Sequence, residues 1–453
     1  MSKPSIPQGM RDFSSETVRK RNYIFSKIKE VFEIYGFQPL ETPAMENLET
    51  LMGKYGEEGD RLIFKILNNG LNDPKNQEKA KEGFEKLLEG KSSKAITERA
   101  LKYDLTIPFA RYVAMNHGQL TFPYKRYQIQ QVWRADRPQK GRYREFTQCD
   151  ADVVGSNALI NEVELAHVYH DVFTKLGLKD YCLKINNRKI LASLAIECGD
   201  INLLTNITIA IDKLDKIGID KVKLELEQKG LNQSQINAIE RYLNISGSND
   251  DKLIQIENLL GSNEQAQEGI KELKYILTHL NPINIEIDFT LARGLDYYTG
   301  SIFEVKAPAS VQMGSIGGGG RYDNLTGLFG VPNIPGVGVS FGVDRIYDVM
   351  EEMQLFPQDL QISTKALFFN MGEKESEYAY KIMQELRKDG IACELYHELS
   401  KLDKQFKYAE KKNITYAVII GSKEIEQNCA ILKNLSSGIQ ENIPFNQLAE
   451  KIK

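Results

Sequence analysis

The chain has 453 residues, of which 42% are hydrophobic and 26% charged, and its net charge is −4. This composition is typical of a globular protein of two to four domains, at about 100 to 200 residues per domain, and it excludes a surface that coats nucleic acid as a whole. The five cysteines form no C-x-x-C pair and no apolar run of about 18 residues occurs, so we predict free thiols in a reducing cytosol, no zinc cage and no membrane span.

The amino-terminal region predicts a helix followed by a strand. Apolar residues such as Ile24 and Ile28 recur at helical spacing over residues 17–35. Gly36 ends the helix, and residues 37–41 form the strand. This order is common in many domains and carries little functional information by itself.

A polar insertion is predicted near residues 68–98, with a short helix over 78–88. The segment that follows places Asp104 and Thr106 just before a helix over 108–114. Their side-chain oxygens are suited to capping that helix, so a purely structural role remains open.

Residues 127–133 and 143–154 predict two strands joined by a polar turn over 136–141. Side chains two apart share a face of the second strand. One face carries polar and aromatic side chains, namely Arg144, Phe146, Gln148, Asp150 and Asp152. The other face is mostly apolar, so this hairpin combines a packing face with a face available for chemistry.

Seven basic residues and only two acids lie between positions 125 and 145. One interpretation is a solvated hairpin whose cations pair with neighbouring carboxylates. The other is a binding face, because arginine forks suit phosphate, Phe146 could stack on a base, and Gln148 and Asp152 are acceptors for an ammonium group.

Residues 157–176 predict a helix that carries His167 and His170. Their spacing permits metal binding, but no third ligand occurs at a matching position, and a solvated helix face is favoured. A strand is expected over 181–185. Residues 199–282 have helical periodicity and no catalytic cluster, so we predict a helical insertion domain there.

A strand over 283–289 follows this insertion, and three segments with recognisable motifs come after the strand. LARGLDYYTG at 291–300 is either a packed strand corner or a site built on Arg293. SIGGGGRYDNL at 315–325 is predicted to be a glycine-rich turn that lets the backbone approach a ligand, without the spacing of a P-loop or dinucleotide fingerprint. Residues 334–350 predict a strand entering a helix near Arg345. This arginine either binds a ligand or has the purely structural role of pairing with a buried acid.

Beyond a linker at 353–364, strands and helices alternate in a βαβαβ pattern that predicts a mainly parallel sheet. The strands are expected over 366–369, 391–395 and 416–420, and the helices over 375–388 and 401–413. Residues 365–453 are therefore predicted to be a separate α/β domain.

Several of these motifs carry a family resemblance. WRADRPQKGRYREFTQ resembles the motif 2 hairpin of class II aminoacyl-tRNA synthetases, and RPQKGRYREF has a spacing close to that of histidyl-tRNA synthetases. LARGLDYYTG and GGGRYD are similar to the two histidine-specific stretches of that family. The helix and strand before Pro43 resemble motif 1, and residues 334–350 resemble motif 3.

The resemblance implies a role for particular residues. ATP would be bound by Arg134, Arg142, Phe146 and Arg345. Histidine would be bound by Asp104, Thr106, Gln148, Asp152, Tyr297, Tyr298 and Tyr322, with Arg111 as a further contact from the DLT-PFAR segment. Arg293 would lie between the substrate carboxylate and the α-phosphate, so that Arg293 and Arg134 are the catalytic residues. The loop residues Arg137, Gln139 and Lys140 would face the tRNA acceptor end.

The resemblance further implies the fold and the activity. We expect an α+β catalytic domain built on an antiparallel sheet, formed by residues 1–198 and 283–352, and a carboxy-terminal α/β anticodon-binding domain. The expected protein is a cytoplasmic homodimer that joins L-histidine to histidine tRNA with ATP and Mg²⁺. A regulatory paralogue without chemistry and an amino-acid ligase acting without tRNA are the alternatives.

Overall fold

The structure is a computed structural model that describes residues 3–280, 283–292, 297–357, 360 and 364–453. The chain forms two compact units, residues 1–355 and 356–453. The division falls inside the segment predicted to be a linker. Each unit has its own sheet and its own apolar core.

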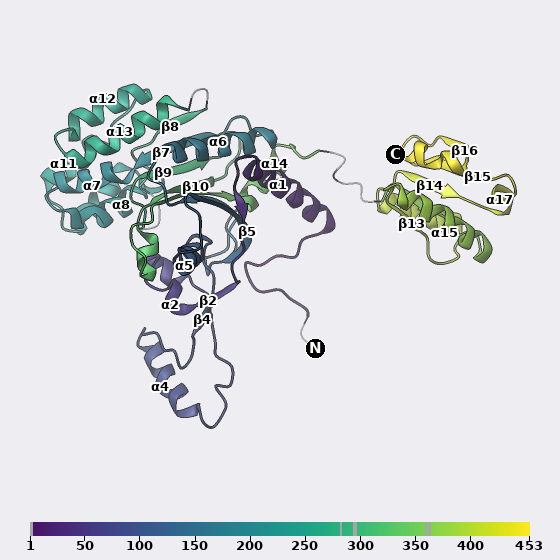
Figure 1. Cartoon of the computed structure of the whole chain (residues 1–453), viewed down its shortest axis with the longest axis horizontal. Helices are drawn as coiled ribbons and strands as arrows, with labels where there is room; N and C mark the ends of the chain where they lie inside the picture. The colour runs from purple at the N-terminus through teal and green to yellow at the C-terminus, as the bar shows by residue number, and fades with distance from the viewer. Residues whose placement is uncertain (1–2, 281–282, 293–296, 358–359, 361–363) are drawn as a thin grey trace. The chain divides into compact units, whose positions relative to one another are not determined.

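Unit 1 is built on an eight-stranded sheet (Figure 1). In spatial order its strands are β1 (Gln38–Pro39), β5 (Tyr124–Trp133), β6 (Glu145–Val154), β11 (Gly336–Gly342), β10 (Ser315–Tyr322), β9 (Ser301–Lys306), β7 (Cys182–Asn187) and β8 (Ile285–Ile287). All neighbours are antiparallel except β1 with β5 and β7 with β8. The predicted antiparallel catalytic sheet and its central hairpin are confirmed.

The helices that cover one face of this sheet include α1 (Ser15–Ile34), α6 (Ile160–Lys175) and α14 (Val343–Glu352). Phe341 on β11 packs between Phe32 of α1 and Tyr169 of α6, with ring centroids 5.8 and 4.7 Å away. Because these rings are fully buried, the apolar side of the predicted alternation is the side that faces the helices.

The glycine-rich segment is not a turn, and this prediction was wrong. Ser315–Tyr322 forms the central strand β10, between β9 and β11. A Cβ atom on Gly319 would lie 2.2 Å from the carbonyl oxygen of Gly338, and one on Gly320 would lie 2.6 Å from that of Ser301. The glycines are therefore required by close contact with neighbouring backbone and not by a turn.

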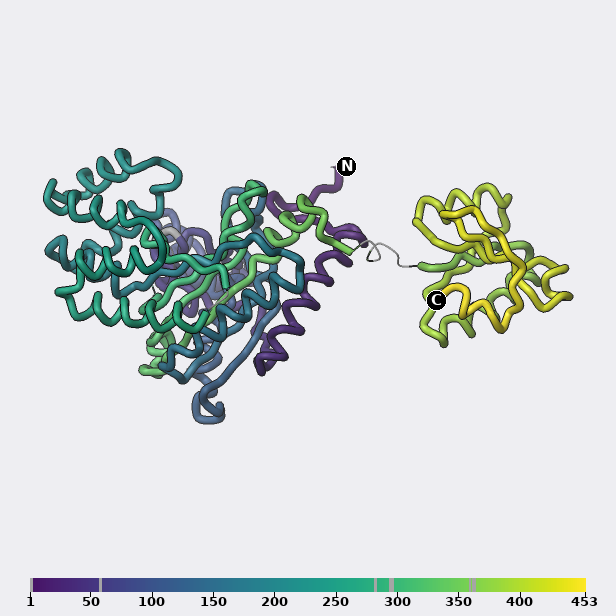
Figure 2. Tube along the Cα trace, turned by 90° about the horizontal axis from the view of Figure 1, so that it is seen from above, coloured from purple at the N-terminus to yellow at the C-terminus, as the bar shows by residue number. Residues whose placement is uncertain are grey.

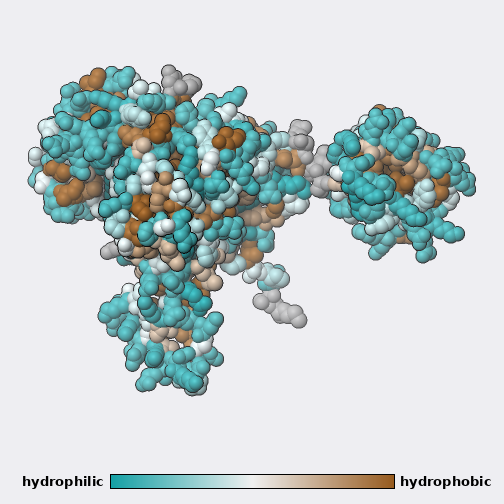
Figure 3. Space-filling view, viewed as in Figure 1, coloured by the Kyte–Doolittle hydropathy of each residue, from teal (hydrophilic) through white to brown (hydrophobic). Residues whose placement is uncertain are grey.

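The opposite side of the sheet carries α5 (Thr106–Asn116), η2 (Leu325–Phe329), α2 (Leu48–Leu51) and α3 (Gly56–Arg61). A small sheet, β2 (Met45–Asn47), β4 (Arg99–Leu101) and β3 (Lys65–Ile66), lies beside them. The predicted helix of the polar insertion is α4 (Gln77–Leu88), which extends from β3 and β4 as an arm (Figure 1). The visible face of the arm is mostly hydrophilic (Figure 3).

Helices also dominate the segment after β7: α7 (Arg188–Glu197), η1 (Ile201–Leu203), α8 (Leu204–Ile211), α9 (Leu214–Ile217), α10 (Ile219–Gln228), α11 (Gln233–Leu243), α12 (Asn249–Leu260) and α13 (Glu264–Thr278). Figures 1 and 2 show them gathered at the end of the sheet that carries β7 and β8, away from α1. All the elements that the structure describes between residues 199 and 280 are helical.

Unit 2 contains a five-stranded sheet in the order β13 (Cys393–Leu395), β12 (Ala366–Phe368), β14 (Tyr416–Ile419), β15 (Cys429–Asn434) and β16 (Gln440–Pro444). The first three strands are parallel, as predicted, and the last two are added antiparallel. Its helices are α15 (Glu373–Lys388), α16 (Leu402–Lys411), α17 (Ser422–Glu426), η4 (Phe445–Gln447) and α18 (Leu448–Ile452).

Within the described ranges no single helix is long and apolar enough to cross a membrane. One bent pair, Arg188–Glu197 with Ile201–Ile211, meets the length and composition requirement only when its parts are combined across a bend of 119°.

The glycine strand gives a direct test of the fold. Gly319→Ala should lower the free energy of unfolding by about 1–3 kcal/mol, because its methyl group overlaps backbone on β11. Gly318→Ala is the matched control, since the nearest atom to its Cβ is 3.4 Å away, and its effect should stay within about 0.5 kcal/mol. Urea denaturation measures both, and equal losses would contradict the packing of β10 against β11.

Candidate active site

A cavity of about 300 Å³ opens on the face of the sheet that carries the polar side of β6. It is lined by every described residue for which ATP or amino-acid binding was predicted, apart from Arg111: Asp104, Thr106, Arg134, Arg142, Phe146, Gln148, Asp152, Tyr297, Tyr298, Tyr322 and Arg345. Side chains from widely separated parts of the sequence therefore meet at one place.

Other predicted residues lie elsewhere. Arg293 falls outside the described residues. Arg111 does not line the cavity, because its guanidinium group binds Glu46 of β2 through Nη2–Oε1 at 2.7 Å. The loop residues Arg137, Gln139 and Lys140 are exposed beyond the cavity wall.

The side chains of Arg345 and Arg134 line the cavity, and the charge of Arg134 acts on Asp104. Arg345 donates from Nε to the carbonyl of Gly141 at 2.8 Å and from Nη1 to that of Ser315 at 2.6 Å. Arg134 donates to the carbonyl of Tyr103 at 3.1 Å, and its guanidinium carbon lies 5.2 Å from the centre of the Phe146 ring. Both guanidinium groups line the cavity, and such groups are suited to binding an anion.

Asp344 fixes the start of the helix that carries Arg345. Its Oδ1 accepts from both Arg11 and Arg21, and its Oδ2 accepts from the main-chain N–H of Thr147 at 3.3 Å. The buried carboxylate thus joins the amino-terminal segment, α1, β6 and α14, and it holds Arg345 against the cavity.

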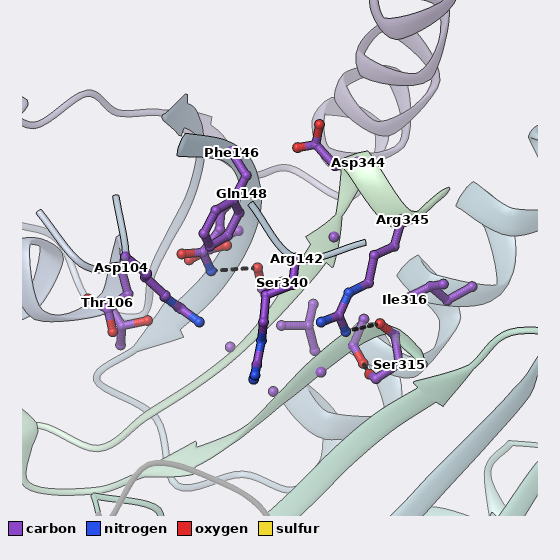
Figure 4. Close-up of a pocket in the computed structure, with 18 of the residues that line it drawn as sticks. Asp104, Thr106, Arg142, Phe146, Gln148, Ser315, Ile316, Ser340, Asp344 and Arg345 are labelled. Carbon is purple, nitrogen blue, oxygen red and sulfur yellow. Dashed lines mark hydrogen bonds between the residues drawn. The ribbon is translucent and has the colours of Figure 1, made fainter. Parts of the chain in front are cut away.

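Acids line the cavity as well, and Asp104, Asp150 and Asp152 are nearly fully buried. Figure 4 shows Asp104 and Thr106 on the opposite side of the cavity from Arg345. Four buried acceptor atoms on the cavity-lining side chains lack a hydrogen-bond donor among the described residues: Asp104 Oδ2, Gln148 Oε1, Asp150 Oδ1 and Asp152 Oδ2. Unsatisfied buried acceptors in one cavity are the pattern expected for a site that receives a donor-rich cation.

Burial controls the charge of these acids. It raises the pKa of Asp104 and Asp152, and it raises the pKa of Asp150 to about 7. For Asp104 the shift is opposed by the N–H of Ile107 and by the charge of Arg134, and then by Tyr55 and Arg126. Arg126 opposes it for Asp150 and Asp152, and the neighbouring charge of Asp152 adds to it for Asp150. A bound cation would favour the ionised forms.

Asp152 is already engaged by protein groups. Its Oδ2 lies 2.8 Å from Nη2 of Arg126, which is fully buried, without the alignment of a hydrogen bond. Its Oδ1 accepts from the hydroxyl of Tyr322. One negative charge is therefore balanced inside the protein, and the charge left for a ligand rests on Asp104 and Asp150.

The capping interpretation is confirmed for Asp104. Its Oδ1 accepts from the N–H of Ile107 at 3.1 Å at the start of α5, and from the hydroxyl of Tyr55 at 2.9 Å. Because both bonds use Oδ1, the capping role leaves Oδ2 without a partner. Capping and binding are therefore compatible.

Pairing of the basic hairpin residues with carboxylates is correct in part. Lys125 binds Glu164 at 2.6 Å, Lys140 binds Glu352 at 3.1 Å, and Arg126 pairs with Asp152. The hydrogen bonds of Arg134 described above go to main chain instead. The hairpin therefore combines structural ion pairs with a cationic cavity wall.

Several cavity residues were given no role in the sequence analysis, and Asp150 and Ser340 are two of them. Asp150 was placed on the polar face of its strand but given no role, and Ser340 was not considered. Strand alternation was the available signal for Asp150. For Ser340 there was none, because its position follows from the pairing of β11 with β6.

Metal ligands are a separate matter. Over the described residues, no group of three or more His, Cys, Asp or Glu side chains is arranged to hold a metal ion. His170, considered earlier with His167, has Nδ1 2.9 Å from the hydroxyl oxygen of Tyr181.

The arrangement suits a ligand pair with opposite charges. Anionic phosphates fit beside Arg134 and Arg345, where preorganised cations can offset charge that develops during a reaction. A cationic group fits beside Asp104, Gln148 and Asp150.

Comparison with known proteins gives a consistent picture. A family model described as histidyl-tRNA synthetase matches residues 78–346, and one described as an anticodon binding domain matches residues 365–453. Proteins named histidine–tRNA ligase from Christiangramia forsetii and Flavobacterium johnsoniae are each 52% identical to this chain, over all of it and 99% of their own length. The crystal structure of histidyl-tRNA synthetase from Nostoc sp. PCC 7120 superposes with a TM-score of 0.81 at 32% identity, covering 100% of this chain and 99% of that one.

The buried pair of Arg126 and Asp152 gives a test that needs no ligand. Arg126→Leu should lower the free energy of unfolding by about 3–5 kcal/mol at pH 8, because Asp152 is left as an unpaired buried charge. Burial raises the folded-state pKa of Asp152, so this penalty is small below the unfolded value near 4 and grows as the pH rises.

Denaturation at pH 5 and pH 8 should therefore show a smaller loss at pH 5. The double variant Arg126→Leu/Asp152→Asn is the control and should regain much of the stability at pH 8. The same loss at both pH values would show that Arg126 acts through packing alone.

Proposed function

Because the chain belongs to the histidyl-tRNA synthetase family, and its activity is the charging of histidine tRNA, we propose that this cavity is where ATP and L-histidine form histidyl-adenylate. The observation that carries the assignment is that one cavity is lined both by arginine side chains and by buried acceptor atoms that have no donor among the described residues. Adenylate formation requires both, because the substrates are a polyphosphate and an amino acid with a free ammonium group.

ATP would lie beside the arginine side chains. Arg134 would bind the α-phosphate, Phe146 would lie under adenine, and Arg345 would stack on the other side of adenine and reach the γ-phosphate. Arg142, whose side chain is 51% exposed, would close over the phosphates from the hairpin loop. The family resemblance supports these roles, and the location of the four side chains on one cavity wall agrees with them.

Histidine would lie beside the buried acceptor atoms. Its ammonium group would donate to Gln148, in the field of Asp104 and Asp150. Its side chain would contact Thr106 and the three tyrosines, Tyr297, Tyr298 and Tyr322. Asp152 would act mainly by holding the hydroxyl of Tyr322, since Arg126 already balances its charge.

The reaction then needs no covalent bond to the protein. The histidine carboxylate attacks the α-phosphorus of ATP and pyrophosphate leaves. A terminal ribose hydroxyl of the tRNA next attacks the adenylate carbonyl carbon, and AMP leaves. Positioning and charge neutralisation by Arg134, Arg345 and Arg293 would supply the catalysis, with Arg293 between the carboxylate and the α-phosphate.

The proposal also includes a magnesium ion, a second copy of the chain and the acceptor end of the tRNA. ATP would arrive as its Mg²⁺ complex, because Mg²⁺ in such sites is held largely by substrate phosphates and water. The protein would be a cytoplasmic homodimer, with α1 and β1 at the dimer interface by their resemblance to motif 1. Arg137, Gln139 and Lys140 would meet the tRNA acceptor end, which their exposure allows.

A regulatory relative without chemistry is not favoured. Relatives named histidine–tRNA ligase match the whole chain at about half identity, including the carboxy-terminal domain that a tRNA ligase requires.

Exchange of labelled pyrophosphate into ATP tests the first step. Exchange should depend on L-histidine and be absent with other amino acids. Arg345→Ala should slow it by about 10²- to 10³-fold, because one preorganised charge contact is lost. Arg137→Ala is the matched control, since it removes an arginine outside the cavity and should leave exchange nearly unchanged. Exchange that does not require histidine would reject the proposal.

Removal of residues 356–453 separates the two steps. Unit 1 keeps the complete cavity and its own core, so histidine-dependent exchange should persist in part. Charging of tRNA at low tRNA concentration should fall severely, because the matched anticodon-binding domain is lost. Normal charging by the truncated protein would remove unit 2 from tRNA recognition.

A further inference from the structure

The side-chain amide of Gln148 is held at one end and open at the other. Its Nε2 donates to Ser340 Oγ at 3.0 Å, shown by the dashed line in Figure 4, whereas its Oε1 is buried and has no partner among the described residues. An amide turned by 180° would present its NH₂ group at the open end. Two donors cannot pair, so the orientation of this amide decides whether Gln148 can accept from an ammonium group.

The hydroxyl of Ser340 sets that orientation. Ser340 lies opposite Asp150 in the strand pairing, where it lowers the pKa of that carboxyl group against the effect of burial, and its oxygen accepts from Gln148. When Asp150 is ionised its carboxylate can only accept, so the hydroxyl hydrogen of Ser340 is directed to Asp150 and the oxygen accepts from Gln148. The hydrogen bonds therefore run in one direction, from Gln148 through Ser340 to Asp150.

Sheet pairing builds this chain into the fold. Ser340 lies directly opposite Asp150 in the pairing of β11 with β6, and Gln148 is its diagonal neighbour. Directly opposite Cβ atoms in such a pair are about 5 Å apart, and diagonal neighbours are within reach of longer side chains. Gly338 and Gly342 flank Ser340 on the same face, so no other side chain of β11 contacts the amide from this strand.

The strand is also held from behind. The hydroxyl of Tyr169 on α6 is 3.0 Å from the carbonyl of Ser340 and 2.9 Å from that of Gly318. Because Tyr169 is fully buried, it ties β11 and β10 to the helical layer at the level of Ser340. Ser340 is therefore held on the helix side of the sheet through its carbonyl and on the cavity side through its hydroxyl.

We propose that Ser340 is a positioning residue: anchored by Asp150, it orients Gln148 so that Oε1 accepts from the α-ammonium group of histidine. This inference rests on the proposed function, because the ligand group is that of the amino-acid substrate. Ser340 acts through Gln148 and makes no contact with the substrate itself. A bound ammonium group favours the ionised form of Asp150. The substrate therefore stabilises the same orientation of the Gln148 amide as Ser340 does.

The first test is Ser340→Ala, measured by pyrophosphate exchange. The KM for histidine should rise on the order of 10-fold, which is the equivalent of one hydrogen bond, while kcat, the KM for ATP and the melting temperature change little. Ser340→Thr restores the hydroxyl and should recover most of the affinity. A Ser340→Ala variant that melts earlier with a normal KM for histidine would show a structural role only and overturn the proposal.

A double-mutant cycle tests whether Ser340 acts through Gln148. Ser340→Ala should add little to the KM for histidine when Gln148 is already alanine, and additive effects would overturn the proposal. The inhibition constant of imidazolepropionate, which lacks the ammonium group, should be the same for wild type and Ser340→Ala.

An equal loss for imidazolepropionate and histidine would assign the effect to another part of the substrate and reject the inference. If the wild type itself shows no histidine-dependent exchange, the proposed function fails. If exchange is normal and the cycle is additive, only the role of Ser340 fails.

Discussion

Backbone pairing of β6 with β11, and of β11 with β10, is the constraint on which the site depends. The register directs alternate side chains of β6 into the cavity and sets Gly338 opposite Asp152 and Ser340 opposite Asp150. A Cβ atom on Gly338 would lie 2.0 Å from Asp152 Oδ1. Small residues on β11 and β10 therefore leave the space into which the acidic side chains and their ligand fit.

The charges that line that cavity come from elements that are far apart in sequence. Arg345 is held in place by Asp344, which joins α14 to the amino-terminal segment, and Asp152 is held by Arg126. A buried ion is costly unless it has a partner, and here Arg11 and Arg21 balance Asp344 while Arg126 balances Asp152. Arg134 and Arg345, and Asp104 and Asp150, line the cavity itself. A fixed scaffold can in this way bring two anionic reactants together while it holds an ammonium group.

The sequence predicts those features that depend on local pattern. Period-two alternation identified the polar face of β6, and family motifs identified most of the side chains on the cavity wall. Contacts across strands were not predictable: the glycines of β10 have the local propensity of a turn, and only close neighbouring backbone makes them a strand. Ser340 and Arg126 were missed as functional supports for the same reason, and β15 and β16 extend a sheet whose first three strands alone had a clear pattern.

The central claim is that one cavity binds the amino acid at its buried acceptor atoms and phosphate at its arginine side chains. A crystal structure with ATP and histidinol, which retains the ammonium group and cannot form an adenylate, tests it most directly. The account predicts the ammonium nitrogen within about 3 Å of Gln148 Oε1 and the phosphates against Arg134 and Arg345. Phosphates against Asp104 and Asp150, or an ammonium group that contacts neither Gln148 nor these acids, would contradict it.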